Sequence, residues 1–409
     1  METEPRGTPP ALHRTLTLPW LVFYGLGVTI GAGIFALIGE ILAIAGDRAP
    51  LAFLLAGLTA GATGISYGLL VTVFPKAGGE AVFVSRGLGP RWGRLVGIGV
   101  AATAIVSSAA IALAFTGYAR LIAPLPAPVL LVMVIGGLTF IAARGIRESM
   151  VFAALITILE VTTLFIVAAV GLPGLTELEF PQALIGTHGS GQPFLPVIMA
   201  AMIAFFAFIG FEDIENMAEE TKRPERTIPL AIVWTLAVTV LLYVLLALVA
   251  VATPFRDEIA GSPAPVAVMF ERLTGIDPAP VSAIAAIAMT NGILVQVVMA
   301  SRVLYGTANE GLLPSWFARV NAKSRTPARA TLFVSGLILA LALLFPLAGL
   351  AEATSLIVIA VFALVNLSLF TLGGMADHTS LSRWRWWGLA AFLLCLGMLG
   401  LNTYGLIVG

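Results

Sequence analysis

Long apolar segments separated by short polar connections make up most of the chain. Crossing a bilayer takes about 20 apolar residues, and eleven segments approach or exceed this length. They lie at roughly 18–44, 50–74, 92–117, 127–143, 149–171, 194–219, 228–253, 280–309, 329–349, 353–373 and 386–408. The pattern predicts an all-α polytopic protein surrounded by a lipid bilayer.

Composition supports this prediction and excludes several other classes. Of 409 residues, 59% are hydrophobic and only 11% are charged, against about 25% charged in soluble domains. The formal net charge is zero, which gives no electrostatic reason for a nucleic-acid partner. The single cysteine, Cys395, excludes an intrachain disulfide and a cysteine-rich metal site. Residues 1–17 lack the apolar core of a cleaved signal peptide, so the first segment should remain as a span.

Basic residues predict the orientation of the chain. Seventeen Lys and Arg residues fall in the N-terminal tail and in the loops that share its side. The opposite loops hold four, namely Arg48, Arg120, Arg256 and Arg272. Because basic loops stay in the cytoplasm, we expect a cytoplasmic N-terminal tail (1–17) in a multi-pass protein of the cytoplasmic membrane.

The first segment contains four closely spaced glycines, Gly25, Gly27, Gly31 and Gly33. Each glycine costs roughly 0.5–1 kcal/mol in a helix relative to alanine, so the helix is weakened in mid-membrane. A second half-helix starting near Gly33 and Ile34 would offer free N–H groups to an anion such as a carboxylate. The alternative is close helix packing through Gly27 and Gly31, which this segment alone favours.

The sixth segment contains Gly210, directly followed by Phe211 and the carboxylates of Glu212 and Asp213. Carboxylates are favoured at a helix N-terminus, so the pattern predicts a second break near residues 209–211. We assign capping roles to Glu212 and Asp213 rather than contact with a substrate.

The half-helix before this break would leave the carbonyls of Phe206, Ala207 and Ile209 facing a cation or an ammonium group. Four phenylalanines cluster here, and they suit either a lipid-facing surface or a hydrophobic gate; they are Phe205, Phe206, Phe208 and Phe211. The two broken segments lie five spans apart, at matching places in two halves of opposite orientation. Such paired interruptions point to the central site of a transporter and outweigh the packing alternative.

Glu160 lies near the middle of the fifth segment. An acidic side chain at the bilayer centre costs about 2.5–3.5 kcal/mol on insertion scales and usually acts on ions, protons or ligands. We interpret Glu160 as a proton carrier. The alternative is a static ion pair or hydrogen bond to another span, with Arg302 of the eighth segment as a candidate partner.

Two connections also carry structural expectations. The glycine-rich loop after the second segment, residues 74–90, suits either a short interfacial segment that helps to gate the inner side or a tight basic connector. Residues 264–273 of the outer loop 253–280 are apolar enough for a surface helix. The last three segments hold few charges, so we expect them to serve as a structural scaffold.

At these residues the sequence resembles the amino acid–polyamine–organocation (APC) superfamily, in particular bacterial amino acid permeases. The resemblance covers roughly residues 15–375, and its specificity comes from the order and spacing of several individually weak motifs. They are Gly31-Ala32-Gly33-Ile34-Phe35, Pro75-Lys76-Ala77-Gly78-Gly79, the run from Phe205 to Glu212, Ala218-Glu219-Glu220 with Pro224, and Ser301-Arg302 onward.

The resemblance implies a LeuT-like fold of two inverted five-helix repeats with an amino acid bound between the two breaks. The ten-helix core would span 18–373, with repeats at 18–171 and 194–373, and 386–408 would be an additional helix. Backbone groups of Ile30, Ala32 and Gly33, with Gly31 and Ile34 beside them, would meet the substrate carboxylate. Carbonyls of Phe206, Ala207 and Ile209, next to Gly210, would meet the ammonium group, and Phe206 would close as an outer gate.

We therefore expect a secondary active amino acid transporter that works by alternating access, as a symporter of a neutral amino acid and a proton carried by Glu160. Many proton-coupled relatives carry a lysine in the fifth span, where this chain has Glu160, so Na+ remains an alternative coupling ion. Relatives often have twelve spans, against eleven here. The rival functions are a Na+-coupled or uncoupled exchanger of amino acids or polyamines, and a substrate sensor or channel.

No enzyme activity and no cofactor are expected. The three histidines, His13, His188 and His378, all lie in tails or loops, and no nucleophile or metal-ligand cluster is evident.

Overall fold

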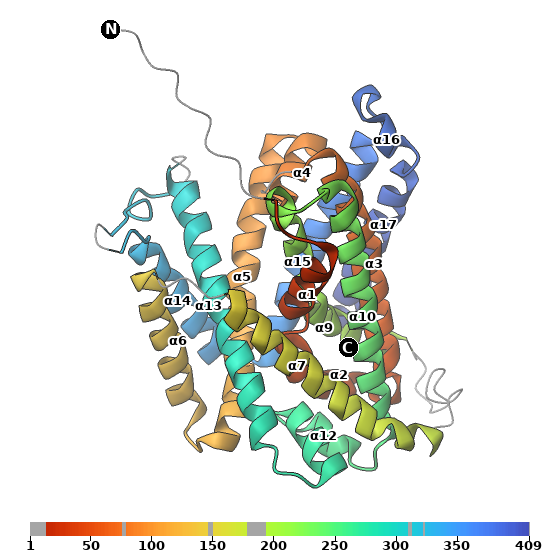
Figure 1. Cartoon of the computed structure of the whole chain (residues 1–409), viewed down its shortest axis with the longest axis vertical. Coiled ribbons are helices and arrows are strands. Elements are labelled where there is room, and N and C mark those ends of the chain that lie inside the picture. The colour runs from red at the N-terminus through yellow and green to blue at the C-terminus, as the bar shows by residue number, and fades with distance from the viewer. Residues whose placement is uncertain are drawn as a thin grey trace.

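The computed structural model describes residues 14–75, 79–145, 150–177, 194–309, 313–321 and 324–408. These residues form helices, turns and loops, and one isolated parallel bridge joins Leu16 to Thr221. The short helix α4 lies at one end of the bundle and α12 at the other (Figure 1). We call these the α4 end and the α12 end.

Helices occupy every segment that the apolar pattern predicts. Their bounds are α1 Leu18–Thr29, α2 Ala32–Ala45, α3 Ala49–Val73, α4 Gly79–Leu88, α5 Pro90–Ile122, α6 Ala127–Arg144, α7 Met150–Gly171, α9 Leu195–Phe205, α10 Pro224–Ala252, α11 Arg256–Ala260, α12 Pro265–Thr274, α13 Ala279–Asn309, α14 Ala328–Leu344, α15 Leu347–Leu372, α16 Thr379–Ser382 and α17 Arg385–Val408. Short 3-10 segments connect some of them, including η3 Phe206–Phe208, η4 Phe211–Glu220 and η5 Ala376–His378.

Nine helical stretches of the described residues are long and apolar enough to cross a membrane. One of these, Ala32–Val73, is 42 residues long and joins α2 to α3, which the sequence pattern assigns to separate segments. Two further apolar helices are shorter, Leu18–Thr29 and Ala328–Leu344. The first is short because the first apolar segment is divided into α1 and α2.

Helices from the two halves of the chain pack against each other in the interior. The most extensive contacts join α3 to α10 and α5 to α13, and α2 packs along α9. Small residues allow this close approach. For example, a side chain on Gly64 of α3 would meet Leu236 of α10 at 2.7 Å.

The loop 253–280 forms two helices, α11 and α12, and α12 confirms the helix expected at 264–273. Val266, Ala267 and Met269 of α12 are fully buried, and α12 packs against α2 and α7. Arg272 forms an exposed ion pair with Glu258 at 2.7 Å.

The last helix, α17, packs against α15 and also touches α3 and α9. The Asn366 amide of α15 donates to Thr63 Oγ1 at 3.0 Å and to Cys395 Sγ of α17 at 3.6 Å. Trp387 donates to the carbonyl of Ala62 at 3.0 Å. The polar atoms that fix α17 therefore come from both halves of the chain.

Candidate functional site

The first apolar segment is interrupted at Ile30 and Gly31. The amide of Ile30 donates to Leu26 O at 2.8 Å and closes the last turn of α1. The chain then turns at Gly31, with ψ −140°, and α2 begins at Ala32 without a side-chain cap. The new helix starts one to two residues earlier than the glycine pattern predicts, and its first-turn N–H groups lack a capping side chain.

The sixth segment is interrupted between Phe205 and Phe211, as predicted. After α9 a single 3-10 turn is followed by extended backbone at Ile209 and by Gly210 with φ 120°. This φ favours glycine. A φ of this kind explains why Gly210 stands at the break.

The second half of the sixth segment differs from the expected α-helix. It is the ten-residue 3-10 helix η4, longer than such helices usually are. Phe211, Ile214 and Met217 recur every third residue, which places them on one face of a helix with three residues per turn. Phe211 and Ile214 are fully buried, so the spacing of these apolar residues fits the tighter helix.

Glu212 caps the second break. Its Oε2 accepts a hydrogen bond from the amide of Gly210 at 2.8 Å, which matches the capping role assigned from the sequence. Asp213 is placed differently, because its Oδ1 accepts from the side chain of Asn216 at 3.4 Å. Its amide donates to Gly210 O at 3.1 Å.

The two breaks touch each other through their backbones. A Cβ on Gly33 would lie 2.5 Å from Ala207 Cα and 2.9 Å from Ala207 Cβ. A Cβ on Gly210 would lie 2.8 Å from the carbonyl oxygen of Val28. Both glycines therefore permit contacts that a larger residue would prevent, and the structure brings the two groups of predicted site residues together.

Tyr243 of α10 links the breaks directly. Its hydroxyl lies 3.1 Å from Thr29 O, at the end of α1, and 3.0 Å from Ala207 O, in η3. One hydroxyl has one proton to donate, so the two carbonyls share this donor. Tyr243 was not predicted from the sequence, although a single tyrosine in the apolar run 228–253 was a usable signal.

The carbonyls at the second break have the following partners. Ala207 O accepts from Tyr243, and Phe206 O accepts from the amide of Ile209 at 3.3 Å. A carbonyl oxygen has two lone pairs, so each retains capacity for a second donor. Either carbonyl could therefore accept a second hydrogen bond without losing its present one.

The four phenylalanines around the second break are buried, so they do not face lipid. Phe206 is 7% exposed, whereas the other three are fully buried. Phe208 packs against Tyr243 with ring centroids 5.2 Å apart, and Phe211 packs against Tyr67 at 5.8 Å. Phe206 is thus the least buried member of the cluster.

Glu160 lies on α7 and is 3% exposed. It lies within electrostatic reach of Tyr243, the residue that links the breaks. One turn earlier, Thr157 lies against α1 where Gly27 leaves room for it. Arg302 is exposed, and no ion pair among the described residues joins it to Glu160.

No group of three or more His, Cys, Asp or Glu in the described part of the chain is arranged to hold a metal ion. His378 packs against the ring of Phe74 at 5.4 Å, and His13 and His188 lie outside the described residues.

These features define a class of protein, a multi-pass helical membrane protein with two interrupted helices in contact at its centre. Comparison with known proteins gives the family, because the amino acid permease family matches residues 21–405. The chain belongs to the amino acid permease family, and it is a transporter rather than an enzyme.

Three curated relatives show the range of this family. An uncharacterized transporter of Mycobacterium tuberculosis is 33% identical over 374 residues, covering 90% of this chain and 83% of its own. A methylthioribose transporter of Bacillus subtilis is 26% identical, covering 88% and 82%. A branched-chain amino acid permease of the same organism is 27% identical, covering 88% and 81%.

Proposed function

We propose that this protein is a secondary active transporter that binds a neutral amino acid between the breaks of its first and sixth segments. The contact between Gly33 and Ala207 carries the proposal, because it places the start of one half-helix beside the end of another. The start of a helix attracts a carboxylate and the end of a helix attracts an ammonium group. An amino acid carries both groups.

The substrate carboxylate would meet the start of α2, formed by residues 30–34. These are Ile30, Gly31, Ala32, Gly33 and Ile34. The ammonium group would meet the carbonyl side of the second break, formed by Phe206, Ala207, Ile209 and Gly210. Phe206 would act as the outer gate, in keeping with its slight exposure.

Packing across the chain supports two inverted repeats, 18–171 and 194–373, within a core of 18–373. The second predicted span packs on the seventh through α3 and α10, and the third on the eighth through α5 and α13. Likewise, the first and sixth meet through α2 and α9. All eleven segments, including 386–408, would cross the membrane, with the α4 end in the cytoplasm.

We further propose that Glu160 carries the coupling proton. Its carboxyl is almost fully buried and interacts electrostatically with Tyr243, so a change in its charge would act on the residue that links both breaks. Burial of an uncompensated carboxylate is costly, whereas a protonated carboxyl is neutral. Glu160 would therefore bind a proton when it is buried, and this proton would be transported together with the substrate.

Uptake of radiolabelled amino acids into proteoliposomes tests this proposal. Accumulation should follow an inward proton gradient and need no Na+. Glu160→Gln should bind substrate but lose at least tenfold of the gradient-driven accumulation, while the exposed Glu225→Gln should behave as the parent. Glu160→Gln that still concentrates substrate in response to pH would disprove the role of Glu160.

A second candidate is an uncoupled exchanger or a transporter of another small solute. The similarity to a methylthioribose transporter favours including such a solute in the panel. Uptake that requires preloaded substrate would support the exchanger, and uptake that depends on Na+ would support the Na+-coupled alternative. Either outcome would leave the proposed binding site unchanged.

A further inference from the structure

A group of acidic side chains gathers at the α4 end and reaches the second break through Glu212, whose carboxyl accepts from the amide of Gly210. Glu80 lies on α4, and Glu212, Asp213 and Glu215 lie on η4. Electrostatic interaction links Glu215 with each of the other three. Glu215 is 2% exposed, and neither of its carboxyl oxygens has a hydrogen-bond partner among the described residues. Water does not stabilise such a carboxyl, so its charge is costly.

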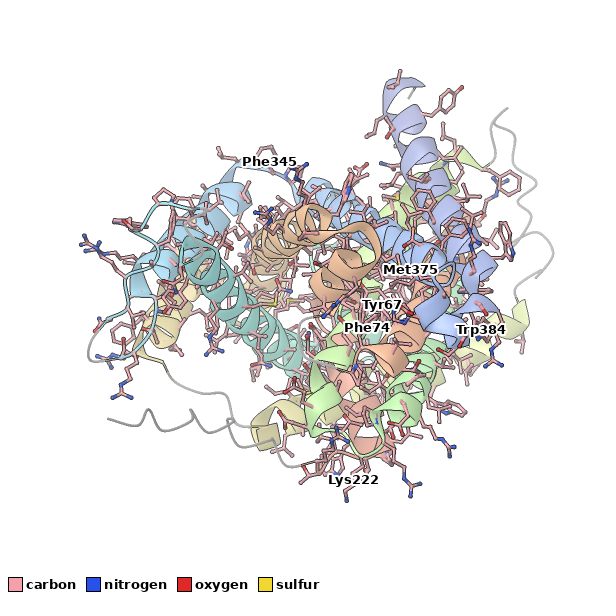
Figure 2. The ribbon with its side chains drawn as sticks, turned by 90° about the horizontal axis from the view of Figure 1, so that it is seen from above. Tyr67, Phe74, Lys222, Phe345, Met375 and Trp384 are labelled. Atoms are coloured by element: carbon pink, nitrogen blue, oxygen red, sulfur yellow. The ribbon has the colours of Figure 1, made fainter. Side chains whose placement is uncertain are left out.

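Tyr67 of α3 gives independent evidence that this group is a site. Its side chain is fully buried, and its hydroxyl faces Glu80 while also interacting with Glu215. Among the described residues, no atom stands in hydrogen-bonding geometry to that hydroxyl. The ring is held between Phe83 of α4 and Phe211 of η4, at 6.0 and 5.8 Å. Figure 2 looks onto this end and labels Tyr67, Phe74 and Lys222.

The acidic side chains sit at a contact between two elements. Gly79, the first residue of α4, lies directly against the Glu215 carboxyl, and a Cβ there would also approach Asn216 Oδ1 at 3.6 Å. The backbone of Gly79 has φ 50°. Any charge on Glu215 therefore acts where α4 meets η4.

Among the residues that the structure describes, charged groups of the other elements packed on η4 do not compensate the cluster. The segment α1 contains no charged residue, and the charges at the start of α10, Glu225 and Arg226, are exposed. Ion pairs among the described residues lie at the α12 end, and no cluster there or here is arranged to hold a metal ion. Protons are the ligands that can neutralise neighbouring carboxyls without a metal.

We propose that Glu80 and Glu215, with the hydroxyl of Tyr67 beside them, form a proton-binding site that holds α4 against η4 and releases it when both carboxyls ionise. The site lies apart from Glu160, so the inference goes beyond the proposed coupling and does not depend on the substrate. Its consequence is a pH-controlled contact at the α4 end.

The direction of the pH effect follows from Glu80. Burial raises the pKa of the Glu80 carboxyl above its ordinary value, while a backbone amide and Tyr67 act in the opposite direction. A pKa that is higher in the packed state means that the packed state binds more protons. The contact is therefore strongest at low pH and is lost as the pH rises through the packed-state pKa.

Distances between spin labels test the proposal without substrate. Labels at the exposed positions Arg86 of α4 and Lys222, just after η4, report the separation of the two elements. The native Cys395 is 1% exposed and stays in place. In the parent the label distance should lengthen as the pH rises above the ordinary pKa of a glutamate. Glu215→Gln and Glu80→Gln should keep the short distance throughout, whereas the exposed Glu225→Gln should respond as the parent.

Tyr67→Phe supplies a variant that keeps the packing of the ring. Without the hydroxyl, Glu80 loses a group that favours its ionised form, so the midpoint of the response should move to higher pH. A parent distance that is independent of pH, or Glu215→Gln that responds like Glu225→Gln, would overturn the proposal. If Lys76→Gln were the one variant that lost the pH response of the label distance, the proposal would also be overturned. The pH response would then come from an ion pair made by Lys76.

Discussion

A single hydroxyl joins the two interrupted helices of this transporter. Tyr243 serves carbonyls that belong to α1 and η3, and its own helix, α10, is continuous. The residue thus connects a rigid element to the two parts of the chain that lack regular hydrogen bonds. A buried carbonyl without a donor costs about 1–3 kcal/mol, so the hydroxyl has both a structural and a positioning role.

We expect Tyr243→Phe to weaken substrate binding about tenfold, because about 1.4 kcal/mol corresponds to a factor of ten. Equilibrium binding to the detergent-solubilised protein measures this effect. Tyr118→Phe is the matched control, since its buried hydroxyl donates at 2.6 Å to the carbonyl of Phe35, one residue beyond the proposed site run 30–34. Equal loss of binding in both variants would show that Tyr243 acts only through stability.

At the scale of elements, the contact between α2 and η3 sets the geometry of the site. Backbones approach closely only where a side chain is missing. Gly33 provides this approach against Ala207, whereas several other glycines have open space around them. At Gly136 of α6, for example, no atom lies within 4 Å of the place that a Cβ would occupy.

Gly33→Ala should push α2 away from η3 and abolish most transport, while Gly136→Ala should leave it within about twofold of the parent. Helix propensity alone would stabilise both variants by roughly 0.5–1 kcal/mol, so the contrast isolates the backbone contact. Initial uptake rates, normalised to the amount of folded protein, provide the measurement. Full activity in Gly33→Ala would contradict the importance of this contact.

For the whole molecule, the distribution of charge predicts the direction in which the bundle is inserted. The α4 end adjoins the basic stretch Lys222–Arg226, and the α12 end carries the few basic residues of the opposite loops. Basic loops remain on the cytoplasmic side. The α4 contact would then respond to the pH of the cytoplasm.

Cysteines introduced singly at Lys222 and Asp257 test the orientation in intact cells. A membrane-impermeant maleimide should label Asp257→Cys from outside and should label Lys222→Cys only after the membrane is opened. Both positions are exposed, so accessibility within the protein does not limit the reaction. The reverse pattern would place the α4 end outside.

Local sequence features were sufficient to predict the long helices, the helix α12 in the loop 253–280 and the approximate positions of both breaks. These features depend on local properties, namely the length of apolar runs, the density of glycine and the position of carboxylates after Gly210. The 3-10 form of η4 was not predicted, because a three-residue spacing of apolar side chains is easily taken for an ordinary amphipathic helix.

Only the tertiary structure revealed the contact of Gly33 with Ala207, the bridging role of Tyr243, and the meeting of Glu80 with Glu215. Each of these pairs or groups joins residues from distant parts of the chain, so their proximity depends on how the helices pack and not on local preference. The cost of burying a carbonyl or a carboxyl is likewise set by the atoms around it. The sequence determined which segments enter the membrane and where they break, and packing decided which polar groups face each other there.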